Sequence, residues 1–437
     1  MSARRAPAPS RRPSSRDRRP PRLLLPGAVS GLLVAAGCAG LPEAGSSDTY
    51  AGLQEATPRT IVRSNLLSVR WMERLVPQDE GPYVPVERSS PVLDPRRNRL
   101  YVGTTQGYLY ALTAGGRRLY RLRAGGAIES HPAFDPDENE LYFGTEQGRF
   151  LSVRAGDGQV RWAAEVRAPV RTSPALSEDA VYVANHDDEV IALSREDGSI
   201  LWEYARSREG EGFSISEHAD VTLAGRFLLG AFTDGAVIAF DAADGTVVWI
   251  RDTSTDLVTD IRDTRARFFD VDTTPVVVDD LVYAASFTGG LYALELSNGG
   301  VRWRDRARTG VTQIARDQDG MLVLASADEG IVRYDPVTQE VRWNAALERG
   351  VPSGIALTGD LVLTGSSRGP FVARDLATGR ELASFEGSAG FTAPPVVGGG
   401  LGFVLSNDGA LFCFEVRPSA PLSTSIERRP SAAESAW

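Results

Sequence analysis

The stretch that decides the fold is residues 272–303, which read DTTPVVVDDLVYAASFTGGLYALELSNGGVRW. We expect four short strands here, at 276–278, 281–285 and 291–296 and in a last segment that ends at Trp303. Val, Leu and Tyr fill these segments and Gly or Asp separates them, an alternation typical of an antiparallel meander. Such a sheet is apolar on both faces and cannot bury them alone, so the pattern should repeat along the chain.

The third segment of this unit occurs eight times along the chain. The copies begin at Leu109, Phe150, Val190, Val237, Leu291, Ile331, Phe371 and Leu411, and successive copies are 41, 40, 47, 54, 40, 40 and 40 residues apart. A period near 40 with four strands per unit is typical of a β-propeller. We therefore predict an all-β fold, an eight-bladed β-propeller whose blades are four-stranded antiparallel sheets.

A large aromatic residue marks the fourth strand of most copies. The residues at this position are Tyr120, Trp162, Trp202, Trp249, Trp303, Trp343 and, in the seventh copy, Ala383. A Gly stands four residues earlier in every one of these copies except the sixth, which has Gln339. We expect the Trp residues, together with Trp71, to be buried between neighbouring blades and to dock each blade on the next.

The two ends of the repeat predict how the ring closes. The eighth copy lacks a fourth strand, because Arg417 and Pro418 interrupt the pattern after residue 416. An unassigned segment, LLSVRW at 66–71, precedes the first copy and carries a Trp of its own. We predict that this N-terminal strand completes the last blade and leaves no partial blade with an unpaired edge. The alternative is a seven-bladed ring with loose ends.

Outside the repeat, the composition predicts three further regions. Residues 1–37 combine eight Arg with an apolar stretch too short to cross a bilayer, which is typical of a signal peptide. Residues 38–60 have the composition of a flexible tether, residues 61–416 form the predicted propeller, and residues 417–437 are expected to be disordered. The signal ends in Ala-Ala-Gly-Cys and resembles that of bacterial lipoproteins, which implies lipidation at Cys38. The alternative is an ordinary secretory signal.

The charge excludes one class of partner. The formal net charge is −10, every basic residue is Arg, and the predicted signal peptide carries eight of these Arg and one Asp. The remaining chain is therefore still more acidic, and we expect no nucleic-acid partner. We expect the propeller to be a monomer.

Two long connections interrupt the regular spacing, at 206–218 and 252–269. Each joins the outer strand of one blade to the inner strand of the next, so both should lie on one face of the ring and flank blade four. Phe213 and Ile215 are apolar residues within the first connection, which favours a surface that binds a partner. Alternatively, they pack back onto the ring.

The pattern gives little sign of an enzyme. The three His residues, His131, His186 and His218, fall in different copies without the spacing of metal ligands. Paired acids such as Asp187 and Asp188 stand at turn positions. We expect no catalytic, cofactor-binding or metal-binding residues, and no cofactor.

The motif A-x-D-x-x-x-G-x-x-x-W, from Ala239 to Trp249, resembles the Trp-docking motif of quinoprotein dehydrogenases and their non-enzymatic relatives. The enzymes of that group add a pair of adjacent Cys residues, a calcium site and a catalytic Asp. This chain has no Cys pair. The resemblance therefore implies the scaffold without the catalysis.

Residues 66–416 more closely resemble the BamB family, eight-bladed lipoproteins of the outer-membrane β-barrel assembly machinery. The resemblance is sharpest at DVDTTPVVV, residues 270–278. In that family this segment and the preceding long loop bind a periplasmic domain of the barrel-inserting subunit. The resemblance thus implies partner binding by Asp270 and Asp272, with Phe213 and Ile215 standing where the family has Leu. A structural alternative is that Asp272 caps a turn before Thr273-Thr274-Pro275 and that Phe213 is buried against the ring.

The resemblance implies a non-catalytic scaffold lipoprotein that is lipid-anchored in the outer membrane and faces the periplasm. Its partner would be the barrel-inserting subunit. Two other functions remain open on the sequence: a quinone-binding or redox propeller, and a periplasmic adaptor with a different protein partner.

Overall fold

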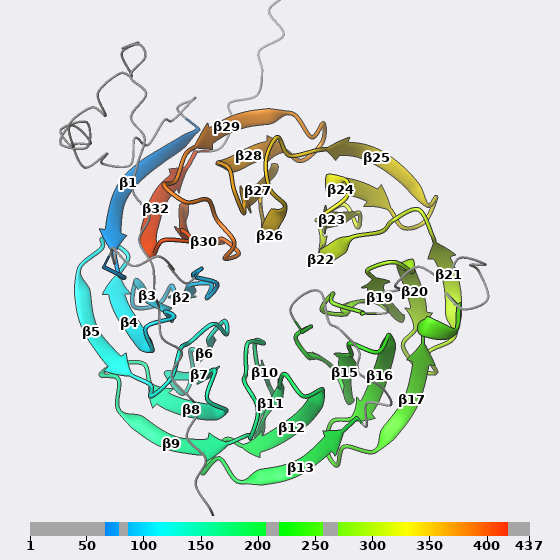
Figure 1. Ribbon diagram of the computed structural model, residues 1–437, viewed down its shortest axis with the longest axis horizontal. Coiled ribbons are helices and arrows are strands. Elements are labelled where there is room, and N and C mark those ends of the chain that lie inside the picture. The colour runs from blue at the N-terminus through cyan, green and yellow to red at the C-terminus, as the bar shows by residue number, and fades with distance from the viewer. Residues whose placement is uncertain (1–65, 78–85, 207–217, 257–269, 418–437) are drawn as a thin grey trace, which may run out of the picture. The chain divides into compact units, whose positions relative to one another are not determined.

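A computed structural model describes residues 66–77, 86–206, 218–256 and 270–417. These residues form 32 strands in eight separate four-stranded sheets, which stand around a common centre (Figure 1). The prediction of an all-β, eight-bladed propeller with four-stranded antiparallel blades is confirmed. The predicted boundaries near residues 37 and 60 lie outside the described residues.

Each blade is a meander in which strands that follow one another in the chain pair antiparallel. The strands of blades 1 to 4 are β2 (Val92–Asp94), β3 (Arg99–Val102), β4 (Tyr108–Thr113), β5 (Arg118–Arg123); β6 (Ala133–Asp135), β7 (Glu140–Gly144), β8 (Arg149–Arg154), β9 (Val160–Glu165); β10 (Ala175–Leu176), β11 (Ala180–Ala184), β12 (Glu189–Ser194), β13 (Ile200–Ala205); β14 (Thr222–Ala224), β15 (Phe227–Ala231), β16 (Ala236–Asp241) and β17 (Val247–Asp252).

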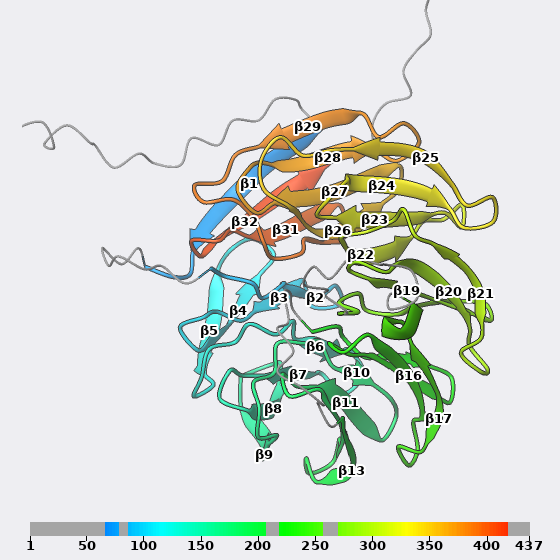
Figure 2. The same cartoon turned by 45° about the vertical axis from the view of Figure 1, so that its right-hand side comes forward.

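The strands of blades 5 to 8 are β18 (Val276–Val278), β19 (Leu281–Ser286), β20 (Gly290–Glu295), β21 (Val301–Asp305); β22 (Val311–Arg316), β23 (Leu322–Ser326), β24 (Gly330–Asp335), β25 (Glu340–Ala345); β26 (Pro352–Thr358), β27 (Leu361–Ser366), β28 (Phe371–Asp375), β29 (Glu381–Phe385); β30 (Val396–Gly398), β31 (Leu401–Leu405), β32 (Ala410–Val416) and β1 (Leu67–Arg74). The fourth strands, β1 among them, follow one another around the rim in both views (Figures 1 and 2).

The core lies between the blades. Among the described residues, eight clusters of buried apolar side chains each join two neighbouring blades, one cluster for each seam of the ring. Between blades 4 and 5, for example, Val237 and Trp249 pack with Val282 and Leu294. Because side chains alternate between the two faces of a strand, each central strand contributes to the seams on both of its sides.

The aromatic residue of the fourth strand lies on the Gly of the next blade. In six blades a Cβ on that Gly would stand only 2.4–3.0 Å from the aromatic ring, and the Gly has a φ between +70° and +89°. A side chain there would be strained as well as obstructed. The five indole N–H groups that donate to carbonyls of the next blade are those of Trp71 to Ala114 (2.9 Å), Trp162 to Arg195 (2.9 Å), Trp202 to Ala242 (3.1 Å), Trp249 to Leu296 (2.8 Å) and Trp343 to Leu376 (2.9 Å).

Trp303 differs from the other Trp residues. The turn that it faces carries Gln339, at a φ of +59°, in place of Gly. Its ring packs between Tyr283 of its own blade and Tyr334 of the next, with centroids 5.9 and 6.1 Å away. No described residue accepts a hydrogen bond from its indole N–H.

The N-terminal strand closes the ring. β1 pairs antiparallel with β32, from Leu67 opposite Val416 to Arg74 opposite Ala410. Two backbone hydrogen bonds extend the ladder, from Arg417 N–H to the Leu66 carbonyl at 3.1 Å and from Leu75 N–H to the Gly409 carbonyl at 2.9 Å. The predicted closure by an N-terminal strand in the last blade is therefore confirmed, and Trp71 on β1 docks that blade on blade 1.

Closure also explains why blade 7 lacks the aromatic residue. The other blades dock on the turn between the third and fourth strands of the next blade, but in blade 8 the fourth strand comes from the other end of the chain. Ala383 therefore has no such turn to face, and phenylalanines fill this seam instead. They are Phe371, Phe385, Phe391, Phe412 and Phe414, all fully buried.

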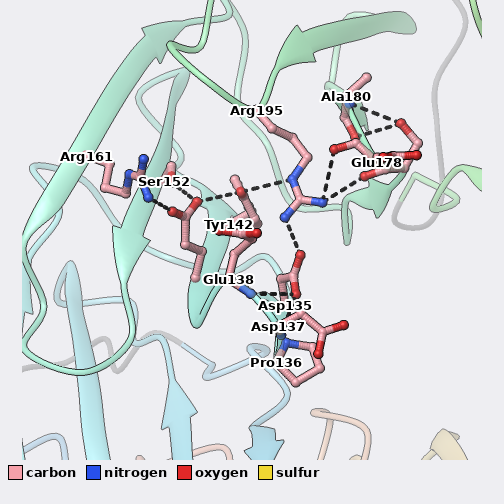
Figure 3. Close-up of polar contacts among 12 residues, drawn as sticks. Asp135, Pro136, Asp137, Glu138, Tyr142, Ser152, Arg161, Glu178, Ala180 and Arg195 are labelled. Carbon is pink, nitrogen blue, oxygen red and sulfur yellow. Dashed lines mark hydrogen bonds and ion pairs between the residues drawn. The ribbon is translucent and has the colours of Figure 1, made fainter.

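Polar side chains also join blades, on the side of the ring that carries the turns between third and fourth strands. Arg195, in such a turn of blade 3, forms an ion pair with Asp135 of blade 2 and donates to the Tyr142 hydroxyl at 3.2 Å (Figure 3). Tyr142 in turn donates to Glu140 at 2.6 Å, and burial raises the pKa of Tyr142 to about 12. These contacts supplement the apolar packing at the same seam.

The docking geometry predicts unequal effects for two Trp substitutions. Trp249 is 7% exposed and donates a hydrogen bond, so Trp249→Ala should lower the free energy of unfolding by about 3–5 kcal/mol. Trp303→Ala should cost less, because this indole faces Gln339 and donates to no described residue. Urea unfolding of both variants measures the difference. A loss below about 1 kcal/mol for Trp249→Ala would show that the indole does not hold the blades together.

Candidate functional site

The described ends of the two long connections lie on the same side of the ring. This side, which we call the loop face, carries the turns between second and third strands and the connections between blades. The first long connection leaves β13 and the second leaves β17, so they flank blade 4 on either side. Phe213 and Ile215 fall within the first and lie outside the described residues.

The ends of both connections converge on one turn of blade 4, residues 232–235. The contacts are an ion pair between Arg206 and Asp234, hydrogen bonds from the Thr253 N–H (2.9 Å) and hydroxyl (2.8 Å) to the Gly235 carbonyl, and one from the Val271 N–H to the Phe232 carbonyl at 3.2 Å. The Arg206 guanidinium also lies 5.9 Å from the centre of the Phe232 ring. The turn thus holds the start of one connection and both ends of the other.

Asp188, in the corresponding turn of blade 3, holds the remaining end. The Thr233 hydroxyl of blade 4 donates to one oxygen of this buried carboxylate at 2.6 Å, and His218 Nε2 lies 3.4 Å from the other. The ring of His218 packs against that of His186, with centroids 4.3 Å apart. His218 is the first described residue after the first long connection, so Asp188 lies beside the point where that connection returns to the ring.

Asp270 and Asp272 lie within the ring. Asp270 is 2% exposed and Asp272 is 9% exposed. The Asp270 carbonyl accepts from the Phe287 N–H at 2.9 Å, and the neighbouring Thr273 hydroxyl accepts from the Ala285 N–H at 2.7 Å. The segment therefore packs into blade 5, and the structure brings it to the same turn of blade 4 as the first long connection.

A second polar region surrounds the centre of the ring, where the chain enters the first strand of each blade. His131 Nδ1 accepts from the Ser90 N–H of the preceding blade at 2.8 Å, and an Asp220 carboxylate oxygen accepts from the Ser173 N–H at 2.6 Å. Burial lowers the pKa of His131 and raises the pKa of Asp220. Because Nδ1 of His131 accepts a hydrogen bond, the imidazole of His131 is neutral. This hydrogen bond links blades 1 and 2.

Glu87 is a buried carboxyl group on the loop face with a raised pKa. It is 1% exposed, and the Thr105 N–H donates to it at 2.9 Å. Burial raises its pKa from 4.5 to about 7, against the opposing effect of the Thr105 hydrogen bonds and with a small contribution from Glu129. Glu129 in turn lies 3.5 Å from Arg171, which pairs with Glu146 through two contacts of 2.8 Å.

The sequence did not predict these contacts. Asp188 was assigned to a turn, which it occupies with a φ of +57°, but its role in holding Thr233 and His218 depends on contacts between blades. Glu87 precedes the first repeat and therefore had no counterpart for comparison. In the part of the chain that the structure describes, no group of three or more His, Cys, Asp or Glu is placed to hold a metal ion. No helix among those residues is long and apolar enough to span a bilayer.

The sequence profile of a family described as outer membrane protein assembly factor BamB matches residues 105–345 and 327–418. The BamB of Yersinia pestis is 28% identical over 264 residues, which is 60% of this chain and 65% of the relative. The BamB of Burkholderia pseudomallei is 28% identical over 272 residues, 60% of this chain and 68% of the relative. The BamB of Escherichia coli is 27% identical over 298 residues, 57% of this chain and 73% of the relative.

Solved structures of other proteins share the fold. The crystal structure of BamB from Moraxella catarrhalis has a TM-score of 0.65 at 20% identity and covers 80% of this chain and 99% of its own. A quinohemoprotein alcohol dehydrogenase from Comamonas testosteroni has a TM-score of 0.61 at 14% identity, covering 81% of this chain and 77% of its own. At these identities the likeness concerns the architecture alone.

The raised pKa of Glu87 predicts a pH-dependent stability. A carboxyl whose pKa is higher in the folded than in the unfolded chain adds stability below about pH 4.5, and this stability is lost as the pH rises through about 7. Compared with Glu87→Gln, the wild type should lose about 2–3 kcal/mol of unfolding free energy over that interval. Thermal or urea unfolding across this pH range measures it, with Glu348→Gln, at an exposed site, as the control. Equal dependence of stability on pH in the wild type and in Glu87→Gln would contradict the raised pKa of Glu87.

Proposed function

The chain belongs to the BamB family of outer membrane protein assembly factors, and we propose that it is a non-catalytic scaffold lipoprotein that assists the assembly and insertion of β-barrel proteins into the outer membrane. In this proposal the loop face around blade 4 binds the barrel-inserting subunit. Lipid on Cys38 anchors the chain, and the propeller faces the periplasm.

One structural observation carries the proposal of a binding surface at blade 4. The two long connections of the chain are attached to the same turn, through Arg206, Thr253 and Val271, and His218, at the returning end of the first, lies 3.4 Å from Asp188. Segments that are longer than the repeat requires therefore leave the ring side by side. The closed ring beneath them provides a rigid base, and loops held on a rigid base lose little conformational entropy when they bind.

The burial of Asp270 and Asp272 suggests that the proposed binding residues have different roles. Asp270 and Asp272 are almost inaccessible, so we assign them a positioning task, in which they hold the second connection against blades 4 and 5. Contact with the partner would then rest on the first connection, with Phe213 and Ile215 as its apolar anchors. Apolar anchors at the centre of an interface contribute most of its affinity.

Substitution of the two anchors tests the proposal. Phe213→Ser combined with Ile215→Ser should abolish co-purification of the chain with the barrel-inserting subunit from membranes and should leave the melting temperature unchanged. The reason is that this double variant removes apolar contact area without altering the buried Asp188 or the turn at 232–235. The measurement combines affinity isolation with thermal unfolding of the purified variant.

Val337→Ser is the matched control. Val337 is 86% exposed and lies in the turn between β24 and β25, on the opposite side of the ring from the loop face. This variant loses an exposed apolar side chain elsewhere and should bind normally. The proposal fails if the Phe213 and Ile215 variant still binds the subunit, or if binding is lost only together with folding.

A further inference from the structure

The outer strand of blade 1 differs in charge from the rest of the rim. β5 reads RLYRLR, and its exposed residues are Arg118, Arg121 and Arg123. The other seven outer strands, all of which the structure describes in full, each contain at least one Asp or Glu, whereas β5 contains none. The sequence between Asp94 and Glu129 has seven Arg and no acidic residue, in a chain whose formal charge is −10.

Acidic neighbours compensate only some of these charges. Among the described residues, the ion pairs of this region join Arg96 to Asp137 at 2.7 Å, Arg97 to Asp94 at 3.3 Å and Arg118 to Glu73 at 2.8 Å. Arg117, Arg121 and Arg123 are exposed and have no carboxylate partner among those residues, although Arg121 lies over the Tyr108 ring at 4.8 Å. We call these three residues the basic rim.

The basic rim acts locally despite the acidic charge of the whole molecule. At physiological ionic strength the Debye length is about 8 Å, so charges on distant blades are largely screened from a ligand bound at β5. An anionic surface along β5 therefore interacts mainly with the Arg side chain nearest to each of its charges. Guanidinium groups donate paired hydrogen bonds to phosphate oxygens, which favours a phosphate-bearing ligand.

The position of β5 indicates which phosphate-bearing ligand it meets. Arg118, at the start of β5, donates to the Arg74 carbonyl at 2.6 Å and pairs with Glu73, so β5 follows directly after the end of β1 on the rim (Figure 2). β1 is the first described strand after Cys38 in the sequence, and a lipid anchor at Cys38 would join the ring through it.

We propose that the basic rim binds the headgroups of anionic phospholipids in the bilayer that holds the chain. The choice of a bilayer rests on the lipid anchor in the proposed function, whereas the binding of anionic headgroups rests on the charges of β5. Contact at β5 would turn blade 1 toward the membrane and leave the loop face at blade 4, on another part of the ring, open to a protein partner.

Vesicle sedimentation tests this directly. The chain from Ala56 to Trp437 forms one compact unit that contains the whole closed ring and lacks both Cys38 and the Arg-rich N-terminus, so any binding comes from the unit that holds the ring. It should bind vesicles of phosphatidylethanolamine with phosphatidylglycerol and not vesicles of phosphatidylcholine. Binding should weaken as salt shortens the Debye length toward about 3 Å at 1 M.

A triple variant, Arg117→Gln with Arg121→Gln and Arg123→Gln, should lower the vesicle affinity at least tenfold, because each Arg near an anionic surface contributes about fivefold, or about 1 kcal/mol. The matched control replaces three exposed Arg on other blades, Arg226→Gln with Arg302→Gln and Arg380→Gln, and should stay within about twofold of the wild type, since those residues lie outside the basic rim.

Three outcomes would overturn the proposal: equal binding to neutral vesicles, unchanged binding of the triple variant, or an equal loss in the control. Loss of a co-purified acidic protein by the triple variant, without vesicle binding by the wild type, would also overturn it and would assign the rim to a protein ligand. None of these results depends on the barrel-inserting subunit, so failure here is distinguishable from failure of the proposed function.

Discussion

The packing of an aromatic side chain on the turn of the next blade is the contact on which the ring depends. A four-stranded blade is apolar on both faces, so it is stable only with a neighbour on each side. The Trp and Gly pair sets the distance between two blades. The Gly has no side chain, so the indole packs closely on the turn, and the hydrogen bond from the indole N–H fixes the orientation of the indole. The same contact closes the ring, since Trp71 arrives on a strand from the other end of the chain and docks on blade 1.

Much of this architecture follows from the sequence because it repeats. A motif that recurs about every 40 residues predicts the strands within a residue or two, as β18 and β19 show. The missing fourth strand of blade 8 predicts the place of β1. Contacts between blades are harder to predict, because they join residues with no fixed spacing. Asp188 with Thr233, His186 with His218, and Glu87 with Thr105 all belong to this class.

Departures from the repeat carry the functional information, and the sequence predicted only part of it. The two long connections were predicted to flank blade 4, and the structure attaches them to the turn at 232–235. The backbone part of this attachment recurs in other blades, as from the Val166 N–H to the Gly148 carbonyl, whereas the Arg206–Asp234 ion pair and the Thr253 hydroxyl bond depend on side chains. The burial of Asp270 and Asp272 was also beyond the sequence, because an acidic pair beside a turn is compatible with an exposed or a buried position.

The two proposed binding surfaces lie on different blades of the ring. The proposed protein surface lies on the loop face at blade 4, and the basic rim lies on the outer edge of blade 1 (Figure 1). A protein bound to the loop face at blade 4 need not displace a ligand from the basic rim, provided that the ring between blades 1 and 4 stays closed. Closure at the seam of β1 and β32 is therefore the condition that both surfaces share.

Hydrogen–deuterium exchange of the native chain, read by mass spectrometry, tests closure most directly. If β1 locks the ring, amides of β1 and β32 should exchange as slowly as those of β16 in blade 4, because all of them open only when the whole ring unfolds. Fast exchange confined to β1 and β32, with β16 still protected, would contradict this account. It would show that blade 8 opens on its own and that the ring does not depend on its N-terminal strand.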